Sequence, residues 1–294
     1  MSNKPLKPVA INIDKVGHDK LKTKKYKNGQ ESKQARMTYD KVEFRIQTPL
    51  AEVPFGLTKG EELDKDGNPV KNSTKPIKYS LDFNVAGPPA GSVELEEFSK
   101  VMKTLDTKTV NYIVSQSQEW WGKKGTAENI AEYVYSSVIK QDKKGEYPDR
   151  FKIKLPLFEG KPRFKVYDEH NKLVDWVKSE EGPDGKEVVT LEWEKWAQPH
   201  MKIEAIIECE GLWEVNKKVF CTFKALQIRV HPPETLPDCA FDDGPFDDGP
   251  VAVKTAKATK AVEEKVEDDP EDEGDEDAAD EDVADEDAGD EDAA

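Results

Sequence analysis

The feature that most limits what this chain can fold into is the alternation of apolar and polar residues along several short runs. Two early runs are YDKVEFRIQTPL, with Val42, Phe44 and Ile46 at alternate positions, and PIKYSLDFNV, with Ile77, Tyr79, Leu81 and Phe83. A period of two is typical of a strand with one buried face and one solvated face. The pattern predicts a mainly β fold.

Further runs of this kind follow in the second half of the chain. They are RFKIKLPL, PRFKVYDEH, LVDWV, EVVTLEW and the long final pair MKIEAIIECEGLWEVNKKVFCTFKALQIRV, which turns near residues 215–217. Five or more strands separated by polar turns predict a small closed or partly open barrel.

A change of period near Ser92 indicates a helical insertion at about residues 92–140. Apolar residues recur at helical spacing from Leu95 to Leu105, and Ser92 is placed to cap the first turn. We expect a second helix up to Trp120, ended by Gly122, and a third from Ile130 to Val138.

The acidic C-terminus cannot join a folded core, because it contains almost nothing apolar to bury. From Glu263 to Ala294 the chain has 20 carboxylates and one base, Lys265, whereas residues 1–262 have 43 bases and 41 acids. The tail therefore carries a formal charge of −19 and the rest of the chain +2, which together give the net charge of −17. We expect residues 263–294 to be disordered.

The remaining organisation follows from composition. Residues 1–37 are rich in lysine, but their alternation is too poor for a confident strand and their periodicity too poor for a helix, which predicts a partly ordered basic arm. Residues 38–232 form the expected barrel domain. Residues 233–262 form a linker that contains FDDGP twice, with Phe241 and Phe246 as its aromatic residues.

Several functional classes lack support in the sequence. There is no signal-peptide pattern and no apolar run long enough to span a membrane, so we expect an intracellular protein that is not secreted. No nucleotide-binding, metalloprotease or nucleophile motif occurs, so we expect neither an enzyme nor a bound cofactor. Cys209, Cys221 and Cys239 lack metal-ligand spacing even with His231, so no metal site is expected.

Binding chemistry is better represented. In RFKIKLP and PRFKVYD, the apolar residues alternate with Arg150, Lys152 and Lys154 in the first run and with Arg163, Lys165 and Tyr167 in the second. If the apolar residues face the core, two strands that we expect to be adjacent present five bases and a tyrosine on one outer face. Such a face suits a nucleic acid strand, because cations meet phosphates and a ring stacks on any base. An ordinary solvated sheet face is the alternative.

The basic arm adds a second candidate surface, with lysines surrounding one tyrosine. A disordered solubilising leader would have the same composition. Among the tryptophans outside the helices, Trp176 is expected to be the most exposed, because it lies beside a short polar turn. The candidate nucleic-acid contacts are Lys22, Lys24, Lys25, Tyr26, Lys27, Arg36, Arg45, Arg150, Lys152, Lys154, Arg163, Lys165, Tyr167, Trp176 and Lys224.

The final hairpin, ECEGLWEVNKKVFCTFKALQIRV, followed by an acidic tail, resembles the single-stranded-DNA-binding proteins of phages and large DNA viruses. The motif-like positions are Cys209, Gly211, Trp213, Phe223, Lys224 and Gln227. This resemblance implies an OB-fold with a detachable anionic C-terminus. In phage members that tail ends in an aromatic residue, whereas this chain ends in Ala293 and Ala294; Phe241 or Phe246 could supply an aromatic further upstream.

These patterns favour a non-catalytic protein that coats single-stranded DNA during replication, recombination or repair. Its acidic tail would compete with DNA and recruit replication proteins, and a homo-oligomer is compatible with the sequence. The main alternative is a histone or protein-binding chaperone that acts through the tail. A viral structural protein with an incidental acidic tail is a third possibility, and the tail could also be a solubility segment that never touches the domain.

Overall fold

The computed structural model describes residues 4–25, 31–60, 77–86, 92–142, 144–181, 187–215 and 217–233. Tyr26, Lys27, Phe241, Phe246, nearly all of the expected linker and the whole acidic tail lie outside these ranges. The strands are β1 (Val16–His18), β2 (Lys22–Lys25), β3 (Glu31–Ala35), β4 (Met37–Tyr39), β5 (Val42–Glu43), β6 (Arg45–Gln47), β7 (Ala51–Val53), β8 (Leu57–Gly60), β9 (Lys78–Ala86), β10 (Tyr135–Ser136), β11 (Ile139–Lys140), β12 (Asp149–Leu155), β13 (Leu157–Phe158), β14 (Lys161–Pro162), β15 (Lys165–Tyr167), β16 (Val177–Glu181), β17 (Glu187–Leu191), β18 (Met201–Val215) and β19 (Lys218–His231). The helices are α1 (Val93–Trp121), α2 (Ala127–Tyr133) and the 3-10 turns η1 (Pro8–Ala10), η2 (Ile13–Lys15) and η3 (Trp193–Lys195).

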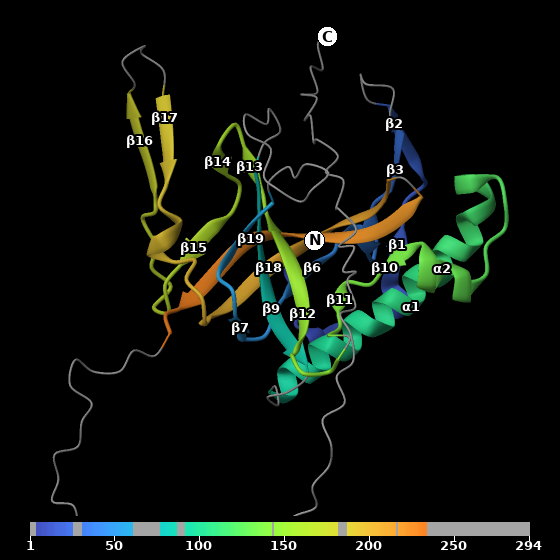
Figure 1. Ribbon diagram of the computed structural model, residues 1–294, viewed down its shortest axis with the longest axis horizontal. Coiled ribbons are helices and arrows are strands. Elements are labelled where there is room, and N and C mark those ends of the chain that lie inside the picture. The colour runs from blue at the N-terminus through green and yellow to red at the C-terminus, as the bar shows by residue number, and fades with distance from the viewer. Residues whose placement is uncertain are drawn as a thin grey trace, which may run out of the picture. The chain divides into compact units, whose positions relative to one another are not determined.

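The strand pairings form a circuit around the long hairpin of β18 and β19 (Figure 1). β19 pairs in parallel with β12, β12 pairs antiparallel with β9, and β9 pairs with β8. Residues 45–60 complete the circuit, because β6 and β7 pair with β18 while β8 pairs with β9. This is the strand order of a partly open OB-like barrel, so the predicted mainly β fold is confirmed.

The alternating residues fill the barrel as predicted for most strands. Phe83 from β9, Phe151 from β12 and Phe223 from β19 are buried. The ring centroid of Phe151 lies 5.4 Å from that of Phe83 and 5.1 Å from that of Phe223. Val42 and Ile77 are exceptions at strand margins, where their side chains are 41% and 46% exposed. The period-two pattern therefore identified the inner face of the barrel, but not its margins.

The helical insertion is confirmed, with a correction to its parts. The two helices expected between Ser92 and Gly122 form one helix, α1, of 29 residues. Ser92 Oγ accepts a hydrogen bond from the Leu95 amide, and Gly122 ends the helix with a φ of 71°, as expected. No glycine or proline interrupts the segment between the two apolar stretches, so the helix continues through it. The third helix, α2, stops at Tyr133, short of the expected end at Val138.

The basic arm contributes strands to the main sheet. β2 and β3 pair with each other, and β3 adds to β18 through the register of Leu212 with Ala35. Gly211 has a φ of 112°, and a side chain there would meet the backbone of residues 35–37. A glycine at this bulge allows the arm to approach β18 closely. Local alternation in the arm is weak because the strand gains its stability from a partner far along the chain.

Neither of the described α-helices is long and apolar enough to cross a membrane.

Candidate nucleic-acid interface

The predicted division of β12 into an inner and an outer face is confirmed. Phe151, Ile153 and Leu155 are buried, whereas Lys154 is exposed and its basic neighbours are half-buried. The same holds for β15, where Val166 is buried, Lys165 is exposed and Tyr167 is half-buried. We use the name outer face for the solvent-facing sides of β6, β18, β19, β12 and β15.

The expectation that the two basic strands are adjacent is wrong. In the described part of the chain no ladder joins β12 to β15; each pairs in parallel with β19. Lys154 lies opposite Lys224, and Lys165 lies opposite Gln227, three positions further along β19. The two strands therefore follow one another along the same edge, separated by the β13–β14 hairpin, and their bases form an elongated row.

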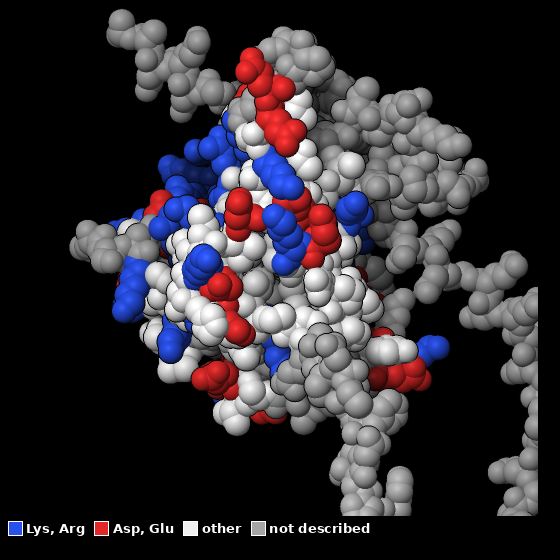
Figure 2. Space-filling view, turned by 90° about the vertical axis from the view of Figure 1, so that its left-hand side faces the viewer, with Lys and Arg blue, Asp and Glu red and all other residues white. Residues whose placement is uncertain are grey.

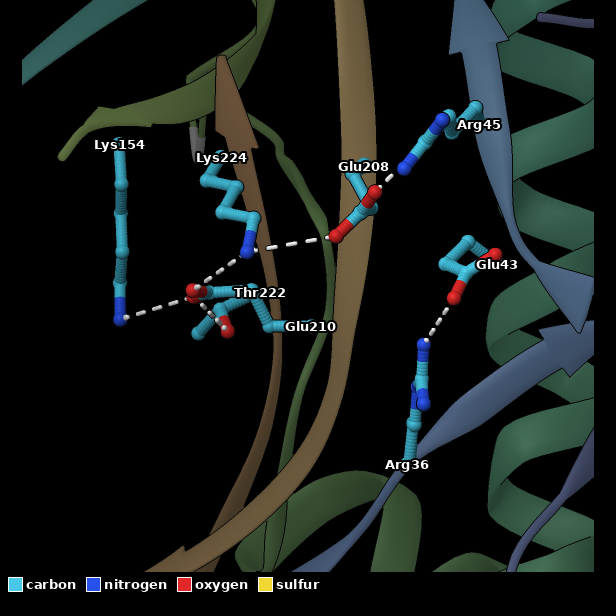
Figure 3. Close-up of polar contacts among 8 residues, drawn as sticks. All are labelled: Arg36, Glu43, Arg45, Lys154, Glu208, Glu210, Thr222 and Lys224. Carbon is cyan, nitrogen blue, oxygen red and sulfur yellow. Dashed lines mark hydrogen bonds and ion pairs between the residues drawn. The ribbon is translucent and has the colours of Figure 1, made fainter. Parts of the chain in front are cut away.

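Across β6, β18, β19 and β12, basic and acidic side chains alternate in a row that we call the charge ladder (Figure 3). Arg45 Nε lies 2.7 Å from Glu208 Oε2, and Lys224 Nζ lies 3.3 Å from Glu208 Oε1. Glu210 continues the row, with its oxygens 4.0 Å from Lys224 Nζ and 3.8 Å from Lys154 Nζ. The Thr222 hydroxyl also donates to Glu210 Oε2, at 3.0 Å.

Sequence reasoning missed Glu208 and Glu210. The signal was present, because both acids occupy alternate positions in the first run of the final hairpin. What the sequence did not reveal is that Arg45, 163 residues away along the chain, pairs beside them. Three of the predicted contact residues, Arg45, Lys154 and Lys224, are therefore ion-paired within this row.

The remaining predicted bases of this region lie in a different environment. We call Arg150 and Lys152 of β12, Arg163 just before β15 and Lys165 of β15 the open bases. Within the described residues, none of the four forms an ion pair. The two arginines instead lie against aromatic rings: Arg150 Cζ is 5.3 Å from the centroid of Phe55, and Arg163 Cζ is 4.5 Å from that of Phe158. Such cation–π contacts leave the positive charge available to a further ligand.

The distribution of charge over one side of the molecule is visible in Figure 2, which looks onto the side that lies at the left of Figure 1. Acids and bases intermingle over the centre of the view, whereas bases gather with few acids along its upper left margin. A mixed surface and a basic surface thus occur side by side.

Phe55 is an exposed aromatic residue that sequence reasoning did not single out. Its side chain is 61% exposed and lies in the turn between β7 and β8. Gly56, with a φ of 65°, has no space for a Cβ atom because the backbone of residues 197–199 lies against it. This tight contact fixes the turn and holds Phe55 beside Arg150. The sequence signal was the tripeptide Pro54-Phe55-Gly56, an aromatic residue between two turn-forming residues.

The prediction that Trp176 is exposed is wrong, because its side chain is only 3% exposed. Its ring packs in a cluster with Phe164, Trp193 and Trp196, at centroid distances of 5.6, 4.8 and 5.5 Å. The polar turn near Trp176 is local, whereas the cluster gathers residues from three separate segments. Trp176 therefore serves the core and cannot stack on a base.

The structure describes only some of the predicted contact residues of the basic arm. Arg36 is exposed and its Nη2 lies 2.8 Å from Glu43 Oε1 (Figure 3). Lys22, Lys24 and Lys25 belong to β2, with Lys22 exposed, and the side chain of Lys24 is not described. Tyr26 and Lys27 lie outside the described residues.

The outer face carries a shallow hollow of about 250 Å³, lined by residues that include Gln47, Tyr167 and Gln227. No group of potential metal ligands occurs among the described residues.

The thiols of Cys209 and Cys221 are free, with their sulfurs 3.5 Å apart. This contact and burial raise the pKa of Cys221, which keeps its thiol protonated and unreactive.

Comparison with known proteins gives only remote likenesses. No protein-family model matches the chain, and no curated protein matches it. Among solved structures, the chain is similar to gp2.5, a single-stranded DNA binding protein encoded by bacteriophage T7, with 10% identity over 72% of this chain and 100% of that one, and a TM-score of 0.36. It is also similar to the single-stranded DNA-binding protein of bacteriophage Enc34 in complex with ssDNA, with 10% identity over 72% and 94% of the two chains and a TM-score of 0.35. These values assign no family to the chain.

Proposed function

We propose that this chain is a non-catalytic protein that binds single-stranded DNA along the outer face of its barrel. The observation that carries the proposal is the exposed ring of Phe55 held against Arg150, next to a row of bases on β12 and β15. OB-fold barrels bind oligonucleotides on the face of their second and third strands, and the third strand of this barrel, β12, belongs to the outer face.

The chemistry of this face suits a single strand better than a duplex. Unstacked bases can lie on an exposed aromatic ring, whereas bases in a duplex are already stacked on one another. The open bases supply positive charge to phosphates at several points along one direction. Contacts of both kinds tolerate any base sequence, so we propose binding that depends weakly on sequence and strongly on salt.

We further propose that the acidic tail competes with DNA for these bases and, when displaced, recruits basic regions of replication proteins. The 20 carboxylates from Glu263 onward make it a polyanion, and its covalent attachment keeps it at a high local concentration. The basic arm would extend the binding surface through Lys22, Lys24, Lys25, Tyr26, Lys27 and Arg36. Action during viral DNA replication, recombination or repair, and association of copies on one strand, belong to the same proposal.

The tail also supports a second candidate, a chaperone of histones or other basic proteins. The two functions depend on different parts of the chain. A strand-binding protein loses its ligand when the bases of the barrel are neutralised, whereas a chaperone loses its ligand when residues 263–294 are removed.

One titration separates the two. The full chain is mixed with oligo(dT), duplex DNA of equal length and core histones at 50 and 200 mM salt. We expect the tightest binding to oligo(dT), with a slope of log K against log salt of about −0.7 for each phosphate neutralised. Binding to histones alone would support the chaperone, and a salt-independent affinity for oligo(dT) would contradict the proposed contacts.

A further inference from the structure

The charge ladder poses a physical problem for the proposed function. Its cations are well placed for phosphates, yet each already has an anionic partner on β18. A phosphate that approaches Lys154 or Lys224 meets the carboxylate of Glu210 at the same time. The repulsion between the two anions opposes binding at every ladder cation.

The exposures of the ladder side chains show which groups a ligand can reach. Glu208 and Glu210 are 13% and 21% exposed, whereas Lys154 is 47% exposed and Lys224 is 30% exposed. The cations thus extend further into solvent than the acids that hold them. A phosphate can therefore contact the ammonium groups from the solvent side while the two carboxylates stay in place beneath them.

The ladder also differs from a purely structural ion-pair network. Three cations face two carboxylates, so the row keeps a net charge of +1, and the longer separations of 3.8 and 4.0 Å are loose ion pairs rather than tight hydrogen bonds. Pairs of this kind at a partly exposed site contribute little to stability. Their main effect falls on the electrostatic potential that an approaching anion experiences.

We propose that Glu208 and Glu210 act as intramolecular counterions that lower the affinity of the outer face for single-stranded DNA. The inference rests on the proposed function and adds residues that determine affinity within it. Because the two carboxylates repel phosphates near Arg45, Lys154 and Lys224, strands bind less tightly than the number of bases would suggest and dissociate faster. Such attenuation suits a coating protein that must be removed from DNA after binding.

The test compares isosteric variants of the full chain. Glu208→Gln and Glu210→Gln keep the side-chain shape and remove one negative charge each. The matched control is Glu192→Gln, because Glu192 also lies between two lysines but is located between β17 and η3. Its oxygens are 2.7 Å from Lys178 Nζ and 2.6 Å from Lys195 Nζ. Affinity and dissociation rate for oligo(dT) are measured at 50 and 300 mM salt, together with the melting temperature of each variant.

We expect each ladder variant to bind about fivefold more tightly than the parent chain at 50 mM salt, mainly through slower dissociation, and the gain to shrink at 300 mM because salt screens the repulsion. Glu192→Gln should change affinity by less than twofold. Unchanged or weaker binding in ladder variants that melt normally would overturn the inference and would assign the carboxylates to holding the cations in position. A parent chain that does not bind oligo(dT) would overturn the proposed function as well.

Discussion

The cations of the charge ladder and the open bases are both arginines and lysines of the barrel surface, and the sequence did not distinguish one group from the other. Arg45, Lys154 and Lys224 are held by two carboxylates of β18, whereas the open bases form no ion pair in the described structure, and two of them contact rings. The nearest acid in the strand register is Asp82 of β9, which lies opposite Lys152 without forming an ion pair. The difference arises from which bases come within ion-pair distance of the acids of β18. A basic side chain keeps its charge uncompensated only when no acid of the sheet pairs with it.

The comparison also separates two ways of placing an arginine. Arg45 forms a short ion pair with Glu208, so its charge is largely compensated. Arg150 Cζ lies over the ring of Phe55, and this contact leaves the charge of the guanidinium uncompensated by an anion. The second arrangement combines a phosphate-binding group and a base-stacking surface in one place.

The largest expected effect comes from neutralising the open lysines. Lys152→Gln with Lys165→Gln should weaken binding to oligo(dT) by about 30-fold, on the order of 1 kcal/mol for each lost contact, and should reduce the salt slope by about 1.4. The matched pair, Lys154→Gln with Lys224→Gln, should cost about threefold, because those charges are already compensated. Fluorescence titration over a range of salt concentrations measures both. Equal losses from the two pairs would remove the distinction between ladder and open bases.

The next effect concerns the exposed ring. Phe55→Ala should weaken binding about tenfold, since stacking of a base on an aromatic side chain contributes roughly 1–3 kcal/mol, and should alter the salt slope little. Tyr133→Ala is the matched control, because Tyr133 is also 61% exposed but lies at the end of α2. If both variants bind like the parent chain, the strand does not pass over Phe55.

A smaller effect is expected from the tail. Removal of residues 263–294 should raise affinity for oligo(dT) roughly threefold to tenfold at low salt, and the gain should fall as salt screens the competing carboxylates. In the Lys152→Gln, Lys165→Gln background the gain should be smaller, because the open bases are the proposed target of the tail. Equal affinities of the full-length and shortened chains at low salt would indicate a tail that never contacts the domain.

The smallest effect is expected at Arg36. Its ion pair with Glu43 is half exposed, at 50% and 35% for the two side chains. Arg36→Gln should therefore change the free energy of unfolding by less than about 1 kcal/mol and the affinity by about twofold. Chemical denaturation and the same titration check both values. A loss as large as that of the open lysines would place the arm at the centre of the binding surface.

The local sequence pattern was sufficient to predict the buried face of β12 and the two ends of α1. Phe151, Ile153 and Leu155 were assigned to the core by their alternation alone, because successive side chains of a strand point to opposite faces. Ser92 and Gly122 marked the ends of α1 for an equally local reason, since capping involves only neighbouring residues. The predicted boundary between two helices inside α1 was wrong, because a polar stretch without a glycine or proline does not end a helix.

What the sequence determined by itself is therefore the mainly β class, the helical insertion, the inner faces of most strands and a separate anionic tail, all of which follow from neighbouring residues or composition. Only the tertiary structure decided that Trp176 is buried, that the arm joins β18 at Gly211, and that Arg45 meets Glu208 across 163 residues. These outcomes depend on which distant segments pack together. The charge compensation of a base, and with it the candidate site, is a property of that packing rather than of any local pattern.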